Sequence, residues 1–295
     1  MLLLRDAIGT VHARAPANAR IACLVPSITE LVCDLGLAAQ LVARTGFCIH
    51  PREAVASIAK VGGTKDVDMA RLRALAPTHV IVNIDENNKP AVEEIARFVP
   101  HVIVTHPNAP EDNLDLYRLI GGIFDRVAAA EKMGNAMRAA LAAAVRDTAA
   151  LPRENVLYLI WQEPWMTVAR DTYISRTLAA VGWDTVPAAL DTGGDATADA
   201  VFDTAAAPAS AGVRYPQVDL HEAARDAALV LLSTEPYMFR AAHVAALQAQ
   251  LAARVILIDG EMTSWYGSRA IQGIAYLARL RAAGYAGDHR AGQTA

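Results

Sequence analysis

Short apolar runs alternate with helix-like patterns along almost the whole chain. Between the runs, apolar residues recur every three or four positions, which is typical of amphipathic helices. Residues 191–212 show neither period, and we expect a loop there. Strands that alternate with helices usually pair in parallel, so the pattern predicts an α/β protein built from βα units. The predicted strands are Ile21–Val25, Thr78–Asn83, His101–Thr105, Asn155–Ile160, Ala228–Ser233 and Val255–Asp259.

The middle of the chain interrupts this alternation. Residues 111–151 contain no proline, and apolar side chains from Leu116 to Val145 recur there at helical spacing. We expect one helix of about 35 residues, which would be roughly 50 Å long. This predicts two Rossmann-like parallel-sheet lobes, residues 1–110 and 152–295, joined by a backbone helix at 111–151. A ligand cleft is expected between the lobes.

Composition narrows the classes of function. Of the 295 residues, 54% are hydrophobic and 20% are charged, which indicates a packed globular protein. The formal net charge is −4 and the charges are interspersed, so we expect no nucleic-acid partner. No apolar run approaches the roughly 20 residues of a membrane helix, so we expect a protein that is not inserted in a membrane. We also expect a monomer.

The N-terminus and the cysteines bear on the compartment. Arg5 and Asp6 interrupt the apolar run Met1–Leu4 before it reaches the ~7–15 residues of a signal-peptide core. The three cysteines are an odd set without paired spacing, which is typical of a reducing compartment. We therefore expect a cytoplasmic protein as the sequence is written, and a periplasmic one if the true start lies upstream.

The motifs of common enzyme classes are missing from the sequence. It contains no P-loop, no G-x-G-x-x-G after a strand, no G-x-S-x-G and no H-E-x-x-H. We therefore expect no catalytic residues, no metal site and no cofactor. Two alternatives stay open: an enzyme that uses Glu86, Glu163 or Glu235 as a general acid or base, and a metal-ion receptor with ligands from distant segments.

Aromatic and polar residues gather in the segments that follow the predicted strands. The candidate ligand-binding aromatics, with one methionine beside them, are Phe47, Trp161, Trp165, Met166, Tyr215, Tyr237, Trp265 and Tyr266. The polar candidates are Lys65, Asn83, Glu86, Asn87, Glu163, Arg170, Glu235 and Arg269. In parallel sheets these loops line the ligand crevice, and an aromatic ring there offers a flat face to a planar ligand. We expect loops 85–87 and 235–237, one from each lobe, to face each other around a bulky, hydrogen-bonding ligand.

The order and spacing of several segments resemble a known family. They are Arg20–Leu35 (RIACLVPSITELVCDL), Val61–Val82 (VGGTKDVDMARLRALAPTHVIV), Pro164–Val181 (PWMTVARDTYISRTLAAV), Tyr215–Leu232 (YPQVDLHEAARDAALVLL) and Ser264–Arg269 (SWYGSR). Arranged around a central helix, they resemble the helical-backbone (class III) substrate-binding proteins of ABC importers, of the vitamin B12- and iron-siderophore-binding type. The resemblance implies a non-catalytic solute-binding protein for cobalamin or another corrinoid, a haem-like ligand or a ferric siderophore.

The resemblance also implies roles for single residues. In the B12-binding members, aromatic side chains from both lobes sandwich the corrin ring, and Phe47, Trp165 and Trp265 fall at or beside such positions. Tyr215 falls in a segment shared with those members. Asn83 stands where the B12 binder carries a tryptophan, so part of the stacking surface is replaced by a polar group.

The expected partner of such a protein is an ABC permease. Family members display a glutamate on each lobe that docks onto permease arginines. The matching positions here hold Ala70 and Gly267, and Asp68 lies near the first of them. The sequence therefore does not contain the expected docking pair.

Overall fold

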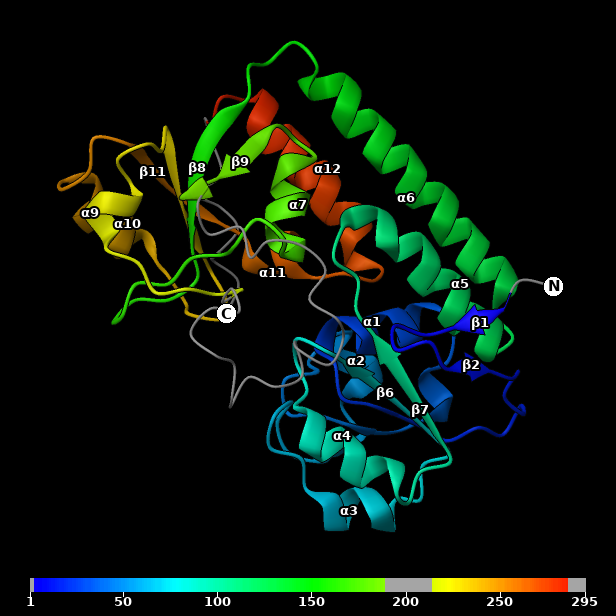
Figure 1. The fold of residues 1–295 in the computed structure, drawn as a ribbon. Helices are drawn as coiled ribbons and strands as arrows, with labels where there is room; N and C mark the ends of the chain where they lie inside the picture. The colour runs from blue at the N-terminus through cyan, green and yellow to red at the C-terminus, as the bar shows by residue number, and fades with distance from the viewer. Residues whose placement is uncertain (1–2, 189–213, 286–295) are drawn as a thin grey trace.

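Two parallel sheets form two lobes, as the alternating pattern predicts. The structure, a computed structural model, describes residues 3–188 and 214–285 (Figure 1). The predicted loop at 191–212 lies outside the described residues. The first sheet has the strand order β5-β4-β3-β6-β7, and the second has the order β11-β10-β8-β9. In both sheets every neighbouring pair of strands is parallel.

The N-terminal lobe begins with a small hairpin and continues as a five-stranded sheet. Its strands are β1 (Leu4–Arg5), β2 (Val11–His12), β3 (Ile21–Cys23), β4 (Leu41–Arg44), β5 (Ala59–Lys60), β6 (His79–Asn83) and β7 (His101–Thr105). Its helices are α1 (Pro26–Asp34), α2 (Arg52–Val55), α3 (Met69–Ala74) and α4 (Lys89–Ala96), with short 3₁₀ turns at Ala38–Gln40 and Pro110–Asp112. All five residues of β6 are buried, which explains its unbroken apolar pattern.

The C-terminal lobe carries the four-stranded sheet. Its strands are β8 (Glu154–Leu159), β9 (Trp183–Thr185), β10 (Leu229–Ser233) and β11 (Arg254–Ile258). Its described helices are α7 (Tyr173–Ala179), α9 (Leu220–Ala223), α10 (Ala241–Gln248), α11 (Gly260–Ser264) and α12 (Arg269–Ala282). Strand β10 is buried along its whole length, like β6 in the first lobe.

The predicted single helix at 111–151 is wrong in one respect, because it is two helices. Helix α5 spans Asn113–Ile123 and α6 spans Val127–Thr148, and the chain turns between them. Asp125 adopts a left-handed φ of 54°, and the Arg126 amide donates to the Gly121 carbonyl at 2.6 Å to close the turn. A Cβ on Gly121 would lie 2.4 Å from that of Ala130, so glycine allows α5 and α6 to pack closely. At 22 residues, α6 is about 33 Å long.

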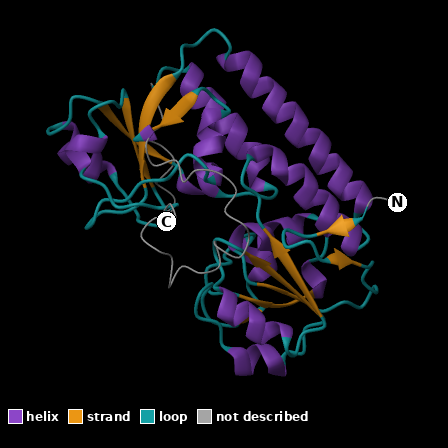
Figure 2. Ribbon diagram, in the orientation of Figure 1, coloured by secondary structure: helices purple, strands orange, loops and turns teal. Residues whose placement is uncertain are grey.

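Helices α6 and α12 connect the two lobes. They pack along each other, and Figure 2 shows the long helix α6 extending from the second lobe toward the first. One continuous cluster of buried apolar side chains extends from β3 through α1, α5, α6 and α12 to β8 and β10. Two separate clusters fill the opposite faces of the two sheets. The lobes therefore share a core on the side of the connecting helices, and the predicted two-lobe α/β fold is confirmed.

None of the helices in the described parts of the chain is both long and apolar enough to cross a membrane.

Candidate functional site

The loops at the carboxyl ends of both sheets meet through hydrogen bonds between the lobes. The Tyr266 hydroxyl, at the end of the loop after α11, donates to the Glu86 carboxylate in the loop after β6. Arg214 donates to Asp85 at 3.2 Å and to the Asn108 side chain at 2.8 Å. These contacts join residues 106 to 180 positions apart in the sequence. The two sets of loops thus enclose one interlobe region, as expected for a parallel α/β protein.

Glu86 is the most perturbed acid of this region. Burial raises its pKa to about 7; the hydrogen bond from Tyr266 works in the other direction, and the charges of Asp85 and Glu235 raise it further. That the loops at 85–87 and 235–237 face each other stays a prediction. Asp85 behaves differently: burial alone would raise its pKa, but His106 and Arg214 hold it below the usual value.

Glu235 lies in the loop after β10 and is bound by its own lobe. One carboxylate oxygen accepts from the Ser264 hydroxyl at 2.6 Å and from the Trp265 indole N–H at 2.8 Å. Burial raises the pKa of Glu235, and nearby Glu261 raises it further. The hydrogen bond to Glu235 holds the indole of Trp265 in place.

Trp265 is surrounded by polar groups from both lobes. The His50 ring of the N-terminal lobe lies 5.7 Å away, edge to face. The guanidinium of Arg269 lies 4.7 Å from the centre of the indole ring, a cation–π distance. His50 Nε2 is also 3.2 Å from a carboxylate oxygen of Glu261.

The guanidinium of Arg269 forms its ion pairs with carboxylates of the protein itself. Its guanidinium donates to both carboxylate oxygens of Glu30 on α1, at 2.8 and 2.6 Å, and also donates to Glu261. Arg269 belongs to the second lobe and Glu30 to the first, so this bidentate ion pair crosses between lobes. We named Arg269 as a ligand contact, but its geometry is that of an interlobe clamp.

The two asparagines that we named are likewise bound internally. Asn83 is fully buried, and its side chain accepts from the Asp85 amide and donates to Thr105. The Asn87 side chain accepts from the Asn83 amide and donates to the Thr64 carbonyl. Both therefore brace the loops of the first lobe instead of presenting amides to a ligand.

Exposed apolar side chains occur in the loops that follow strands of both sheets. Phe47 and Ile49 of the first lobe are 64% and 51% exposed, and Trp161 and Met238 of the second are 40% and 63% exposed. Trp161 packs edge to face against Tyr237 with ring centres 5.5 Å apart. These four residues, which we call the apolar loop set, lie after strands β4, β8 and β10.

The remaining candidates lie around this set or apart from it. Trp165 stacks on Phe239, Met166 pairs through its backbone with Trp161, and Tyr215 packs against the shared core. Lys65 and Glu163 are exposed.

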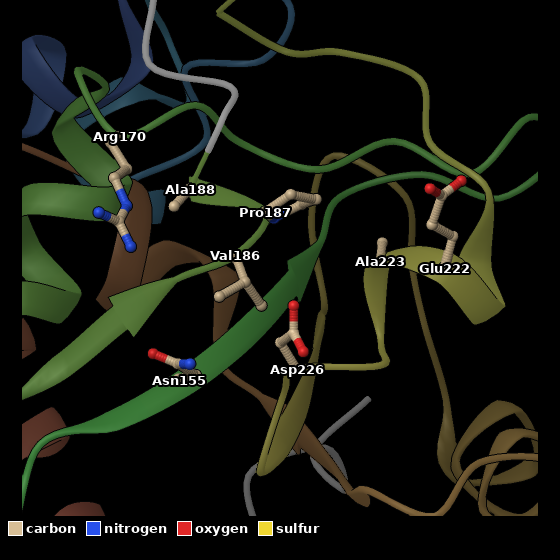
Figure 3. A pocket seen from close by; sticks show the side chains of 8 residues that line it. All are labelled: Asn155, Arg170, Val186, Pro187, Ala188, Glu222, Ala223 and Asp226. Atoms are coloured by element: carbon tan, nitrogen blue, oxygen red, sulfur yellow. The ribbon is translucent and has the colours of Figure 1, made fainter.

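Arg170 lies in a different hollow of about 480 Å³, which Figure 3 shows. Its lining residues all belong to the second lobe, and the Nε of Arg170 donates to the Thr185 carbonyl at 3.1 Å.

Sequence reasoning missed the polar residues that surround the aromatics. His50, Glu261, Ser264, Asp85 and Arg214 all take part in the contacts described above. Each lies within a few positions of a residue that we named, so proximity to those residues was the available signal. Within the described ranges, no three His, Cys, Asp or Glu side chains are grouped so as to hold a metal ion.

Comparison with known proteins identifies the family. Residues 21–249 match the family described as periplasmic binding protein. No curated protein sequence matches the chain significantly. The periplasmic vitamin B12 binding protein BtuF of Vibrio cholerae has a similar structure, with a TM-score of 0.72 and 16% identity over 89% of this chain and 96% of that one.

Two haem-binding proteins are similar to a comparable degree. The periplasmic heme-binding protein RhuT from Roseiflexus sp. RS-1 gives a TM-score of 0.70 at 18% identity, over 90% of this chain and 99% of that one. A periplasmic heme binding protein from Pseudomonas aeruginosa gives 0.71 at 19% identity, over 90% and 92%. At these identities the likeness shows the fold alone, while the family match covers most of the chain. The protein therefore belongs to the periplasmic binding protein family and is a solute-binding protein, not an enzyme.

Proposed function

We propose that the protein binds a corrinoid, a bulky planar macrocycle, between its two lobes. The observation that carries this proposal is the apolar loop set, Phe47, Ile49, Trp161 and Met238. Large apolar side chains at the carboxyl edges of both sheets provide two faces on which a flat ligand can stack. The fold is shared with proteins described as binding vitamin B12 or haem, both of which are flat macrocycles.

The electrostatics of the region favour a corrinoid over haem. Glu86 and Glu235 receive hydrogen bonds from Tyr266, Ser264 and Trp265, which are neutral groups. The nearby cation Arg269 is already paired with carboxylates. Haem carries anionic propionates, which gain no attraction from Glu86 and Glu235, whereas the peripheral amides of a corrinoid can donate hydrogen bonds to the oxygens of these carboxyls.

A fluorescence titration tests the proposal. We would add cyanocobalamin, haemin and a neutral ferric hydroxamate siderophore in turn and follow tryptophan emission. We expect saturable quenching by cyanocobalamin with a dissociation constant in the micromolar range or below. Tight binding of haemin without binding of cyanocobalamin would contradict the electrostatic argument, and no response to any of the three would refute the macrocycle proposal.

Two matched substitutions locate the site. Phe47→Ala removes a 64% exposed ring from the interlobe loops, and Val145→Ala removes a 62% exposed side chain from α6. Loss of one stacking contact should weaken corrinoid binding by about tenfold, which corresponds to roughly 1.4 kcal/mol. Val145→Ala should leave the affinity unchanged. Equal effects of the two substitutions would place the ligand elsewhere.

The family match also supports a proposal about the partner and the compartment. We infer that the protein delivers its ligand to an ABC permease on the periplasmic side. Gly267, the position that we matched to a docking glutamate, is buried, and Asn113 and Tyr117 bind its backbone. The proposed docking surface must therefore use other residues in the second lobe. Cell fractionation of the native organism with an antibody separates this inference from the cytoplasmic expectation, and light scattering tests the expected monomer.

A further inference from the structure

Two buried thiols lie beneath the loop that carries Phe47. Cys23 is the last residue of β3, and Cys48 follows Phe47 in the loop between β4 and α2. Neither residue is exposed at all. The Cys48 sulfur is 3.9 Å from the backbone carbonyl oxygen of Cys23. The side chain of one cysteine thus touches the backbone of the other, although 25 positions separate them.

The loop geometry brings the Cys48 sulfur to the end of β3. The Cys48 amide donates to the Thr45 carbonyl at 3.3 Å, so the chain folds back over the end of the sheet. Burial raises the pKa of both Cys23 and Cys48, and a hydrogen bond with Thr29 acts in the opposite direction on each. The same Thr29 side chain acts on both thiols.

We propose that Cys23 and Cys48 form a disulfide when the protein folds in an oxidising environment. Each thiol loses its proton, one S–S bond forms, and the two electrons pass to a disulfide oxidant such as glutathione disulfide. The S–S bond of the oxidant breaks, and two glutathione thiols leave. This pairing is independent of the ligand proposed above, and it replaces the reading of the cysteines as an unpaired set.

The bond would attach the Phe47 loop to the central strand of the first sheet. Its sulfurs are shielded from solvent, and burial keeps the thiols protonated, so oxidation of the folded, reduced protein should be slow. Formation during folding is the expected route. Cys33 is the natural control, because it lies on α1 and is partly exposed, whereas Cys23 and Cys48 are both buried.

Refolding in a glutathione redox buffer tests the pairing. The denatured product is alkylated, its modified thiols are counted by mass spectrometry, and the linked peptides are mapped. We expect one free thiol in the wild-type chain, with Cys23 linked to Cys48. The Cys33→Ser variant should have no free thiol, and Cys48→Ser should keep two.

The wild-type chain alone decides the matter if a variant fails to fold. Three free thiols after refolding with glutathione disulfide, or a link that includes Cys33, would overturn the proposal. As a second readout, the oxidised wild type should melt roughly 5 °C above the reduced form, because the bond closes a loop of about 25 residues in the unfolded chain.

Discussion

The ion pair between Arg269 and Glu30 should be the strongest single polar link between the lobes. Arg269→Ala removes two hydrogen bonds to Glu30, the contact with Glu261 and the cation–π contact with Trp265. The side chains of Arg269 and Glu30 are each only 14% exposed. Breaking one partner of a buried pair costs about 3–5 kcal/mol, whereas an exposed pair contributes about 0–1 kcal/mol.

The expected loss of unfolding free energy for Arg269→Ala is about 3 kcal/mol. The low exposure places the pair near the buried limit, and partial contact with solvent keeps the value at the lower end of that range. A double-mutant cycle with Glu30→Ala isolates the pair itself, for which we expect a coupling of about 2 kcal/mol. Arg118→Ala is the matched control, because Arg118 pairs with Asp115 at 51% and 74% exposure. It should cost less than about 0.5 kcal/mol.

Urea unfolding measures these values. Far-ultraviolet circular dichroism and tryptophan fluorescence should give coincident transitions, because the shared core links the lobes into one cooperative unit. The reasoning is refuted by a cycle coupling below about 0.5 kcal/mol, which would mean that solvent screens the pair. Loss of most of the coupling in 1 M salt would lead to the same conclusion.

Further predictions concern helix packing and pH. Gly273→Ala would place a Cβ 2.2 Å from the Met262 carbonyl oxygen, where α12 crosses α11, so we expect a loss of at least about 3 kcal/mol in urea unfolding. A Cβ at Gly134 in α6 would meet only Arg138 and Leu114, at 3.6 Å or more, so Gly134→Ala should stabilise the protein by up to about 1 kcal/mol; a loss there would contradict the reasoning. Because the folded-state pKa of Glu86 is raised to about 7 from 4.5, the native state binds more protons between these values, and stability should fall as pH rises through this window. Glu86→Gln should flatten this part of the pH profile, and an unchanged slope between pH 5 and pH 7.5 would show that other groups cause it.

The strands were predictable because their burial is local and continuous. Both β6 and β10 are covered on both faces, so each appears in the sequence as an unbroken apolar run. The turn between α5 and α6 was missed for a related reason. Both helices bury apolar side chains in the same core, so the helical spacing continues across Asp125. Periodicity records which side chains are buried and does not reveal a change in chain direction.

The candidate site was likewise predictable only in part. The loops could be named from the sequence, since their positions after strands follow from the parallel α/β pattern. The hydrogen-bond partners of each polar side chain could not be predicted in this way. Asn83 and Arg269 both follow the pattern, yet one braces its own loop and the other clamps Glu30, which is 239 positions away. The sequence by itself determined the fold class and the loops that surround the ligand region. Only the tertiary structure decided which side chains remain available there, because hydrogen-bond partners depend on distances and directions between segments far apart in the chain.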